Sequence, residues 1–175
     1  MKKFLILAVV GAMLVPSAAV FAQETPKSSF DVSAQCEAMV TRSQERLTAN
    51  ETRHAKNIER MNKSIEKLKK FVEKAQTLGA DTSTLEGDIA ALESALVDLA
   101  ADHQAVQDNL TAMTQVDCTT MTIEEYDNQI ATAKTLFEAV KENIAVIKEI
   151  RQSIKSHVEV IFDAIQSSLN TETSS

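Results

Sequence analysis

The chain has 175 residues, with 18 Lys and Arg against 25 Asp and Glu, and a formal net charge of −7. Hydrophobic residues make up 44%, so the chain can bury a core. Three Gly and two Pro are too few turn-formers for an all-β or α/β fold, and the acidity disfavours nucleic acid and anionic lipid as partners.

Residues 1–22 are typical of a secretory signal peptide. Lys2 and Lys3 form a charged start, residues 4–15 form an apolar run, and residues 20–22 (Val-Phe-Ala) suit cleavage. The run is shorter than the roughly 20 residues that a spanning helix needs, although an uncleaved anchor is the alternative. We expect export to the periplasm, the cell envelope or the medium, with no transmembrane segment after the leader is removed.

Two cysteines, Cys36 and Cys118, lie beyond this leader. In an oxidising compartment they favour a single disulfide, and the alternative is a pair of free thiols. Neither cysteine has a CxxC partner, so the sequence predicts no zinc site, no other metal site and no cofactor.

A first helix is predicted over residues 32–78, after a flexible lead-in at 23–31. Core-facing residues recur at steps of four and three, as in a coiled coil. They are Cys36, Val40, Ser43, Leu47, Asn50, His54, Ile58, Met61, Ile65, Leu68, Val72 and Ala75. The rhythm changes around His54 and residues 41–57 are mostly polar, so this half should be weakly packed. Gly79 is suited to end the helix.

A second helix is predicted over residues 83–114. Ser83 and Glu86 have the spacing of a capping box, in which the hydroxyl and the carboxylate satisfy backbone N–H groups reciprocally. The most regular heptad pattern of the chain follows. Its core-facing residues are Leu85, Ile89, Leu92, Leu96, Leu99, His103, Val106, Leu110 and Met113.

A third helix is predicted over residues 122–169, opened by a second capping box at Thr122 and Glu125. Residues 170–175 are polar and should fray. The core-facing residues are Ile123, Tyr126, Ile130, Ala133, Phe137, Val140, Ile144, Ile147, Arg151, Ile154, Val158, Ile161 and Ile165.

Short connections between three long helices predict an all-α fold, an elongated antiparallel three-helix coiled-coil bundle over residues 32–169 with one disulfide. In this topology Cys36 and Cys118 lie at the same end of the bundle, which favours their pairing. A bond that closes so long a loop stabilises the fold by about 4–5 kcal/mol in the chain-entropy description.

His54 and His103 occupy core-facing positions on different helices, at similar heights when counted from the two cysteines. They form either a proton-sensitive layer or half of a metal site. The alternative is a polar layer that fixes the register of the helices, as a buried Asn does in coiled coils. No third ligand lies at a suitable spacing, which favours the polar layer.

Arg151 is the third member of the predicted polar core layer. A charge in a core-facing position is costly unless it is paired. We expect it either to meet Glu66, Glu86 or Asp88, or to extend its guanidinium group into water.

Additional apolar residues widen the core-facing stripe toward the end of the bundle where the first helix stops. They are Phe71, Val146, Ile150, Val160 and Phe162. They form either a docking surface for a protein partner or a second copy, or the broad core that three helices require.

No motif predicts catalysis. The chain contains no HExxH, Walker or GxSxG sequence, and 4% aromatic residues are too few for sugar or base stacking. Its carboxylates are spread along charged helix faces. We therefore predict no catalytic residue and a protein that is not an enzyme.

The layout resembles that of uncharacterised exported three-helix coiled-coil proteins of small-genome, uncultured bacterial lineages. The shared features are the leader, Cys36 at the start of a charged helix, His54 before Ile58, residues 79–83 (Gly-Ala-Asp-Thr-Ser) before Leu85, and Cys118 before the last helix. The chain departs from that pattern at Ala80, where an aromatic residue is expected. The resemblance implies an exported helical protein without a particular activity.

These features lead to a non-enzymatic structural or interaction module of the cell envelope as the first hypothesis. An extracytoplasmic chaperone or adaptor that binds unfolded or helical clients is the alternative. A membrane-active helical toxin ranks last, because the connection at residues 79–83 is polar and unsuited to insertion.

Overall fold

The computed structural model describes residues 31–172, so the predicted signal peptide and nearly all of the predicted lead-in lie outside the described residues. The described part has three helices and no strand, which confirms the all-α class. The helices are α1 (Val32–Thr77), α2 (Ser83–Thr114) and α3 (Ile123–Glu172). α3 continues past the predicted end at residue 169, into the segment expected to fray.

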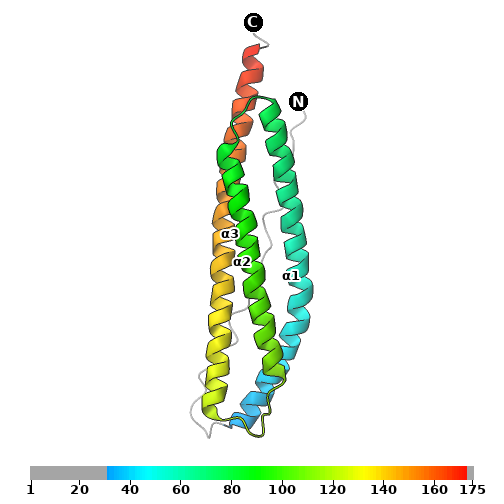
Figure 1. Ribbon diagram of the computed structural model, residues 1–175, viewed down its shortest axis with the longest axis vertical. Helices are drawn as coiled ribbons and strands as arrows, with labels where there is room; N and C mark the ends of the chain where they lie inside the picture. Colours follow the sequence, from blue (N-terminus) through cyan, green and yellow to red (C-terminus); the bar gives the residue numbers. More distant parts are fainter. Residues whose placement is uncertain (1–30, 173–175) are drawn as a thin grey trace. The chain divides into compact units, whose positions relative to one another are not determined.

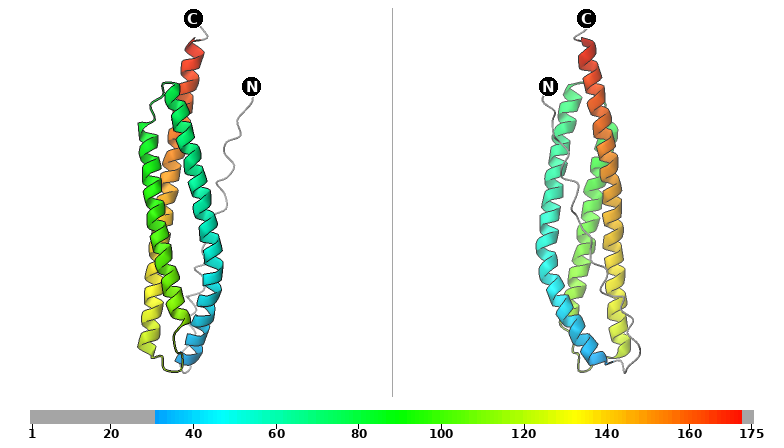
Figure 2. Two further views of the ribbon diagram at one scale, coloured as in Figure 1. Left: turned by 45° about the vertical axis from the view of Figure 1, so that its right-hand side comes forward. Right: turned by 180° about the vertical axis from the view of Figure 1, so that it is seen from behind.

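The three helices lie side by side, and α2 packs against both α1 and α3 (Figure 1). The α1–α2 connection lies at one end of the helices and the α2–α3 connection at the other (Figure 2). α3 extends beyond the α1–α2 connection in all of these views. Because α1 and α3 touch each other little, α1 is held mainly by α2.

Local hydrogen bonds set both ends of α1. The side chain of Asp31 accepts from the backbone N–H of Ala34 at 3.2 Å and caps the first turn. At the other end Gly79 has a φ of 78°, and the N–H of Ala80 donates to the carbonyl of Ala75 at 3.0 Å. This is the Schellman arrangement, so the prediction that Gly79 ends the helix is confirmed.

The start of α2 differs from the prediction. Thr82 is the N-cap, and Ser83 is the first helical residue, whose N–H donates to Asp81 at 3.0 Å. The carboxylate of Glu86 accepts from the Thr82 hydroxyl at 2.5 Å and from Gln76 at 2.7 Å. The predicted Ser83–Glu86 capping box is therefore wrong. With Thr82 as the cap, Glu86 lies one position too far into the helix to complete the box.

The capping box of α3 is confirmed. The Thr122 hydroxyl accepts from the N–H of Glu125 at 3.2 Å, and the Glu125 carboxylate accepts from the N–H of Thr122 at 2.8 Å. Thr122 is thus the cap, and the helix begins at Ile123. Ile123 itself is 54% exposed, so its predicted core-facing place is wrong. It precedes Tyr126, the first residue of α3 that packs on the core.

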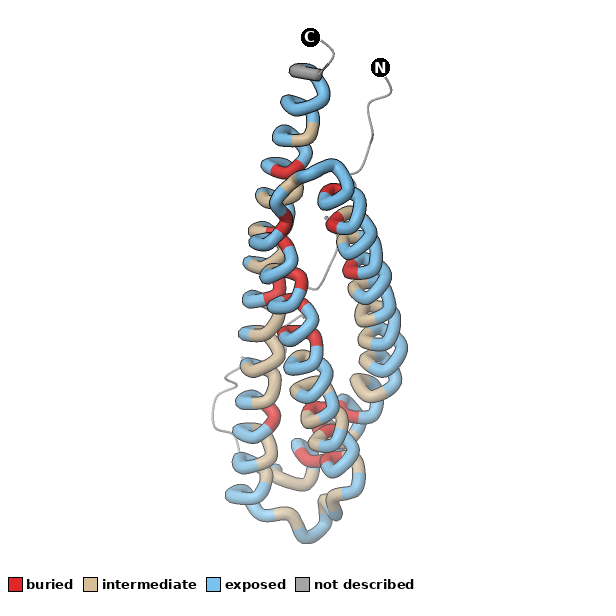
Figure 3. The backbone as a smooth tube through the Cα atoms, turned by 45° about the horizontal axis from the view of Figure 1, so that its top comes forward, coloured by how far each residue is buried: buried red, intermediate tan, exposed pale blue. Residues whose placement is uncertain are grey.

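Two clusters of buried side chains hold the helices together, and every helix contributes to both (Figure 3). The upper cluster consists of Ile65, Val72, Ala75, Leu85, Ile89, Leu92, Ala95, Leu96, Ile147, Ile154 and Ile161. The lower cluster consists of Cys36, Met39, Val106, Leu110, Met113 and Ala133. Most of these positions belong to the predicted core-facing stripes.

A gap separates the two clusters. No residue of α1 between Ser43 and Ile65 is buried, and this stretch is tan and pale blue in Figure 3. On α2 the gap lies between Leu96 of the upper cluster and Val106 of the lower cluster, with His103 inside it. The predicted weak packing of residues 41–57 therefore agrees with the burial pattern.

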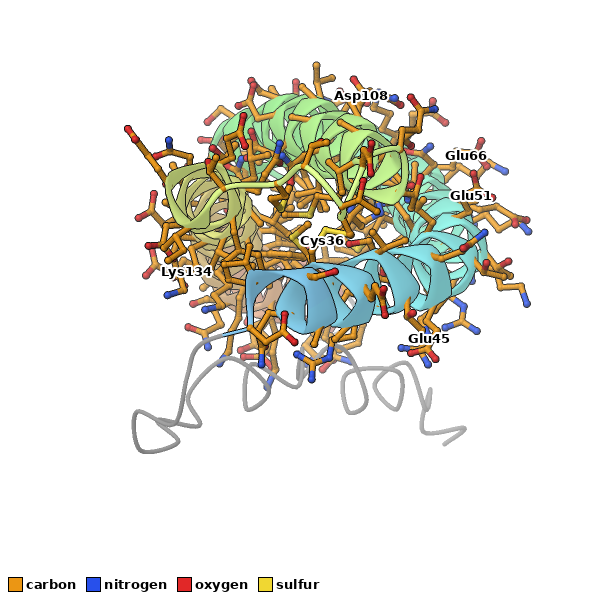
Figure 4. The ribbon with its side chains drawn as sticks, turned by 90° about the horizontal axis from the view of Figure 1, so that it is seen from below. Cys36, Glu45, Glu51, Glu66, Asp108 and Lys134 are labelled. Atoms are coloured by element: carbon orange, nitrogen blue, oxygen red, sulfur yellow. A yellow bond between two sulfur atoms is a disulfide. The ribbon has the colours of Figure 1, made fainter. Side chains whose placement is uncertain are left out.

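A disulfide closes the lower cluster. It joins Cys36 on α1 to Cys118 in the α2–α3 connection, with Cα atoms 5.5 Å apart across a sequence separation of 82. Figure 4 shows Cys36 among the helices, whereas Glu45 and Lys134 point outward. The two cysteines therefore pair as predicted.

Candidate functional site

The rings of His54 and His103 stack on each other between α1 and α2. Their centroids are 3.7 Å apart and their planes differ by 24°. Both residues are half-buried, and within residues 31–172 the Nε2 atom of His103 is buried without a hydrogen-bond partner. The two positions that the sequence placed at similar height are thus in direct contact.

Both rings resist protonation. Burial lowers the pKa of His54 from 6.5 to about 4, and the nearby His103 adds to the effect. Burial also lowers the pKa of His103, although a hydrogen bond to the backbone of Asn50 opposes this change. Near pH 7 the pair is therefore neutral, and a proton on either ring is disfavoured.

The histidine pair lines an open groove of about 330 Å³ between α1 and α2. Glu51 of α1 and Asp108 of α2 also line this groove, and Figure 4 shows both on the outside of the helices. The nitrogen lone pairs lie in the planes of two stacked rings and do not converge on one point. In the part of the chain that the structure describes, no three His, Cys, Asp or Glu side chains are grouped to hold a metal ion.

A third histidine makes a contact that the sequence analysis missed. Nδ1 of His157 on α3 lies 2.7 Å from a carboxylate oxygen of Asp88 on α2. Each residue directly precedes a core residue, Ile89 on α2 and Val158 on α3. Because both residues lie next to core-facing positions on helices that were predicted to pack together, their sequence positions could have suggested this contact.

Arg151 does not meet the carboxylates that were considered as partners. It is half-buried, and among residues 31–172 no salt bridge joins it to Glu66, Glu86 or Asp88. Asp88 contacts His157 instead, and Glu86 accepts hydrogen bonds from Gln76 of α1 and from Thr82 of the α1–α2 connection. The half-exposed side chain fits the other interpretation, in which the guanidinium group reaches water.

The five residues considered as a partner surface fall into two groups. Phe71 and Ile150 pack against the upper cluster, as residues of a broad core would. Val146, Val160 and Phe162 on α3 are 45%, 63% and 48% exposed. Only these last three are available as an apolar contact surface.

Comparison with protein-family models, curated proteins and solved structures finds no match to this chain. None of the helices within residues 31–172 combines the length and the apolar character that crossing a bilayer requires. The interpretation of function therefore depends on the contacts described above.

Proposed function

We propose that the protein is an exported, non-enzymatic module of the cell envelope that acts through contacts with other proteins. The observation that carries the proposal is the disulfide between Cys36 and Cys118. Structural disulfides persist mainly in oxidising compartments outside the cytoplasm. Together with the signal-peptide pattern of residues 1–22, the bond supports export.

In this proposal the three helices form an elongated, antiparallel coiled coil. Leu85, Ile89, Leu92 and Leu96 of α2 are all buried and follow steps of four, three and four, the spacing of a heptad seam. The connections at opposite ends of the helices also support the arrangement (Figure 2). A rod of this kind displays a long lateral surface, which suits a structural or interaction role.

α3 supplies the proposed contact surface. Val146 and Val160 are exposed and separated by two heptads, so they lie on nearly the same side of α3. Phe162 is also exposed but, two residues after Val160, it faces another side of the helix. Exposed apolar side chains that recur along one helix suit the apolar face of another helix. The proposed partner is a helical segment of another envelope protein or a second copy of this chain.

Export is tested by producing the full chain with its leader in a bacterial host and recovering it outside the cytoplasm. We expect a chain that begins near Gln23 and a peptide map in which Cys36 and Cys118 are linked. An intact leader, or two free thiols in the recovered protein, would contradict the proposal.

The contact surface is tested by cross-linking in the native envelope. We expect Val160→Glu to abolish cross-linked species that form with the wild-type protein, because a charge in an apolar contact is costly. Asp163→Asn is the matched control, since it changes an exposed neighbouring residue. Identical cross-linking by all three proteins would argue against this surface.

An extracytoplasmic chaperone or adaptor is the second candidate function, and the exposed apolar side chains of α3 favour it. Such a protein would suppress the aggregation of a reduced client protein, and Phe162→Glu would weaken that suppression. No suppression by the wild-type protein eliminates this candidate and leaves the structural module.

A further inference from the structure

The middle of α1 is the part of this helix that is most weakly attached to the rest of the bundle. The upper cluster reaches down α1 to Ile65, with Ile58 and Met61 partly buried against it, and the lower cluster reaches up to Met39, with Leu47 partly buried. Between the clusters, α1 meets α2 through the stacked His54 and His103 rings and through the hydrogen bond of His103 to the backbone of Asn50. α3 offers little additional support across the gap, because it approaches α1 less than α2 does, and the Arg46 guanidinium that lies over the Phe137 ring, 5.4 Å from its centroid, belongs to the region of the lower cluster.

The stacked contact exists only while the rings are uncharged. Two imidazolium rings with centroids 3.7 Å apart repel each other. A proton on Nε2 of His103 would also create a buried N–H group without an acceptor, because that atom has no partner within residues 31–172. Acid therefore turns the stacking contact across the gap into a repulsive one.

The charged groups around the pair do not prevent this outcome. Glu51 and Asp108 line the same groove from α1 and α2, at its solvent-exposed rim. Asp102, beside His103 on α2, accepts a hydrogen bond from Asn143 of α3 at 2.6 Å. The Asp102 carboxylate is therefore already engaged by Asn143 and is not directed at the histidine pair.

The remaining charges at this height face solvent or one another. On α3, Lys141 is paired with Glu138 at 2.5 Å, and Glu142 is exposed. On α1, Arg53 and Lys56 flank His54 and are exposed. These two cations oppose, rather than favour, a further positive charge on His54.

The contact between α2 and α3 responds differently to acid. Protonated His157 is still an N–H donor to Asp88, so a proton does not break that contact. The Cys36–Cys118 disulfide is covalent and keeps the lower end of α1 attached.

We propose that the stacked His54–His103 pair is an acid-sensitive latch, and that protonation releases the middle of α1 from α2 while the α2–α3 contact and the disulfide stay intact. The released segment uncovers the partly buried faces of Leu47, Ile58 and Met61. Because the pKa of His54 is lowered from 6.5 to about 4 and that of His103 is also lowered, the contact weakens progressively below pH 6.5 and is released toward pH 4. This inference goes beyond the proposed function and does not require a particular partner.

Hydrogen–deuterium exchange of the oxidised mature protein at pH 7.5 and pH 4.5, corrected for intrinsic rates, tests the latch. We expect residues 44–60 and 97–109 to exchange about tenfold faster at pH 4.5, because the open form binds protons that the closed form resists. Residues 150–160 of α3 should keep their protection. Unchanged exchange of residues 44–60 in the wild-type protein would overturn the proposal.

The double variant His54→Phe/His103→Phe keeps an aromatic stack but cannot be protonated, so we expect it to lose the acid response. His157→Gln removes the remaining histidine and should retain that response. If the double variant has wild-type helicity and protection at pH 7.5 but still opens at pH 4.5, the latch is wrong. Should the double variant fail to fold, NMR titration of the wild-type imidazoles decides, because opening must coincide with protonation of His54 and His103 and not with that of His157.

Discussion

Nδ1 of His157 on α3 lies 2.7 Å from the carboxylate of Asp88 on α2, and the two side chains are only 32% and 20% exposed. Partial burial shields this contact from water and salt, so it should contribute more than a surface pair. The Lys69–Glu93 pair between α1 and α2 provides the comparison, since its side chains are 53% and 45% exposed.

The first prediction compares these two pairs by double-mutant cycles in urea unfolding. We expect a coupling energy of about 1 kcal/mol or more for Asp88→Asn with His157→Gln, because a half-buried hydrogen bond to a charged group is lost. Lys69→Met with Glu93→Gln should give a coupling below about 0.5 kcal/mol. Equal couplings would mean that burial does not strengthen the Asp88–His157 contact.

The second prediction concerns how the stability of the fold depends on pH. Because the pKa of His54 is about 4 in the folded chain and 6.5 without its environment, the unfolded chain binds protons first as the pH falls. The stability contributed by the neutral ring is full above pH 6.5 and is lost progressively toward pH 4. After allowance for solvent screening we expect the wild-type melting temperature to fall by about 2–4 °C between pH 7.5 and pH 5. His103→Leu should show a smaller fall, and an equal fall in both proteins would count against this cause.

The third prediction concerns the Cys36–Cys118 bond. Cys36→Ser/Cys118→Ser should lower the free energy of unfolding by about 3–5 kcal/mol, because the unfolded chain is no longer constrained by a long closed loop. Urea unfolding of the oxidised wild type and the double variant measures this difference. The reduced wild type should behave like the variant; a reduced protein as stable as the oxidised one would contradict the prediction.

The fourth prediction separates core from surface on α2. Leu92 is 1% exposed in the upper cluster, and Leu92→Ala should cost about 2–5 kcal/mol by leaving a cavity. Val97 lies on the same helix but is 69% exposed, so Val97→Ala should change stability by less than about 0.5 kcal/mol. Thermal unfolding monitored by circular dichroism compares the two variants. Similar losses of stability in both would contradict the assignment of Leu92 to the core and Val97 to the surface.

The fifth prediction makes the same change at two glycines and expects opposite signs. Gly79 has a φ of 78°, so Gly79→Ala should destabilise by about 1–2 kcal/mol. Gly87 lies within α2 with nothing within 4 Å of an added Cβ, so Gly87→Ala should stabilise by about 1 kcal/mol through helix propensity. Chemical unfolding of both variants provides the comparison; a stabilising Gly79→Ala would refute the left-handed turn.

The sequence predicted the features that repeat or that depend on local spacing. Heptad steps identified buried residues such as Leu85 and Leu92, and the Thr122–Glu125 box forms because both partners belong to one helix turn. The disulfide was predictable because short connections fix which chain ends meet. Each of these conclusions needs only local geometry or topology.

Features that depend on fine positioning were not predictable in the same way. Thr82 and Ser83 are both good caps, and only the path of the connection decides that Thr82 takes that place. Met39 is 5% exposed and lies in the lower cluster, while its neighbour Val40, on the predicted seam, is only partly buried. The rotation of α1 at its lower end decides between them, and the heptad pattern is weakest there.

The candidate site was predicted in position but not in detail. Similar heights of His54 and His103 followed from counting residues, but the stacking of their rings depends on side-chain rotamers. The Asp88–His157 contact was missed because both residues flank the seam, where polar side chains usually face water.

The Cys36–Cys118 bond also determines how the molecule carries mechanical load. Tension applied to the two ends of the chain passes through the two sulfur atoms and along α3, and it bypasses residues 37–117 because they lie within a covalent loop. A pull that unravels α3 would therefore leave α2 and the part of α1 after Cys36 unstretched. Reduction of the bond would add that whole segment to the length over which the chain can be extended, so the redox state would set how far the chain stretches under force.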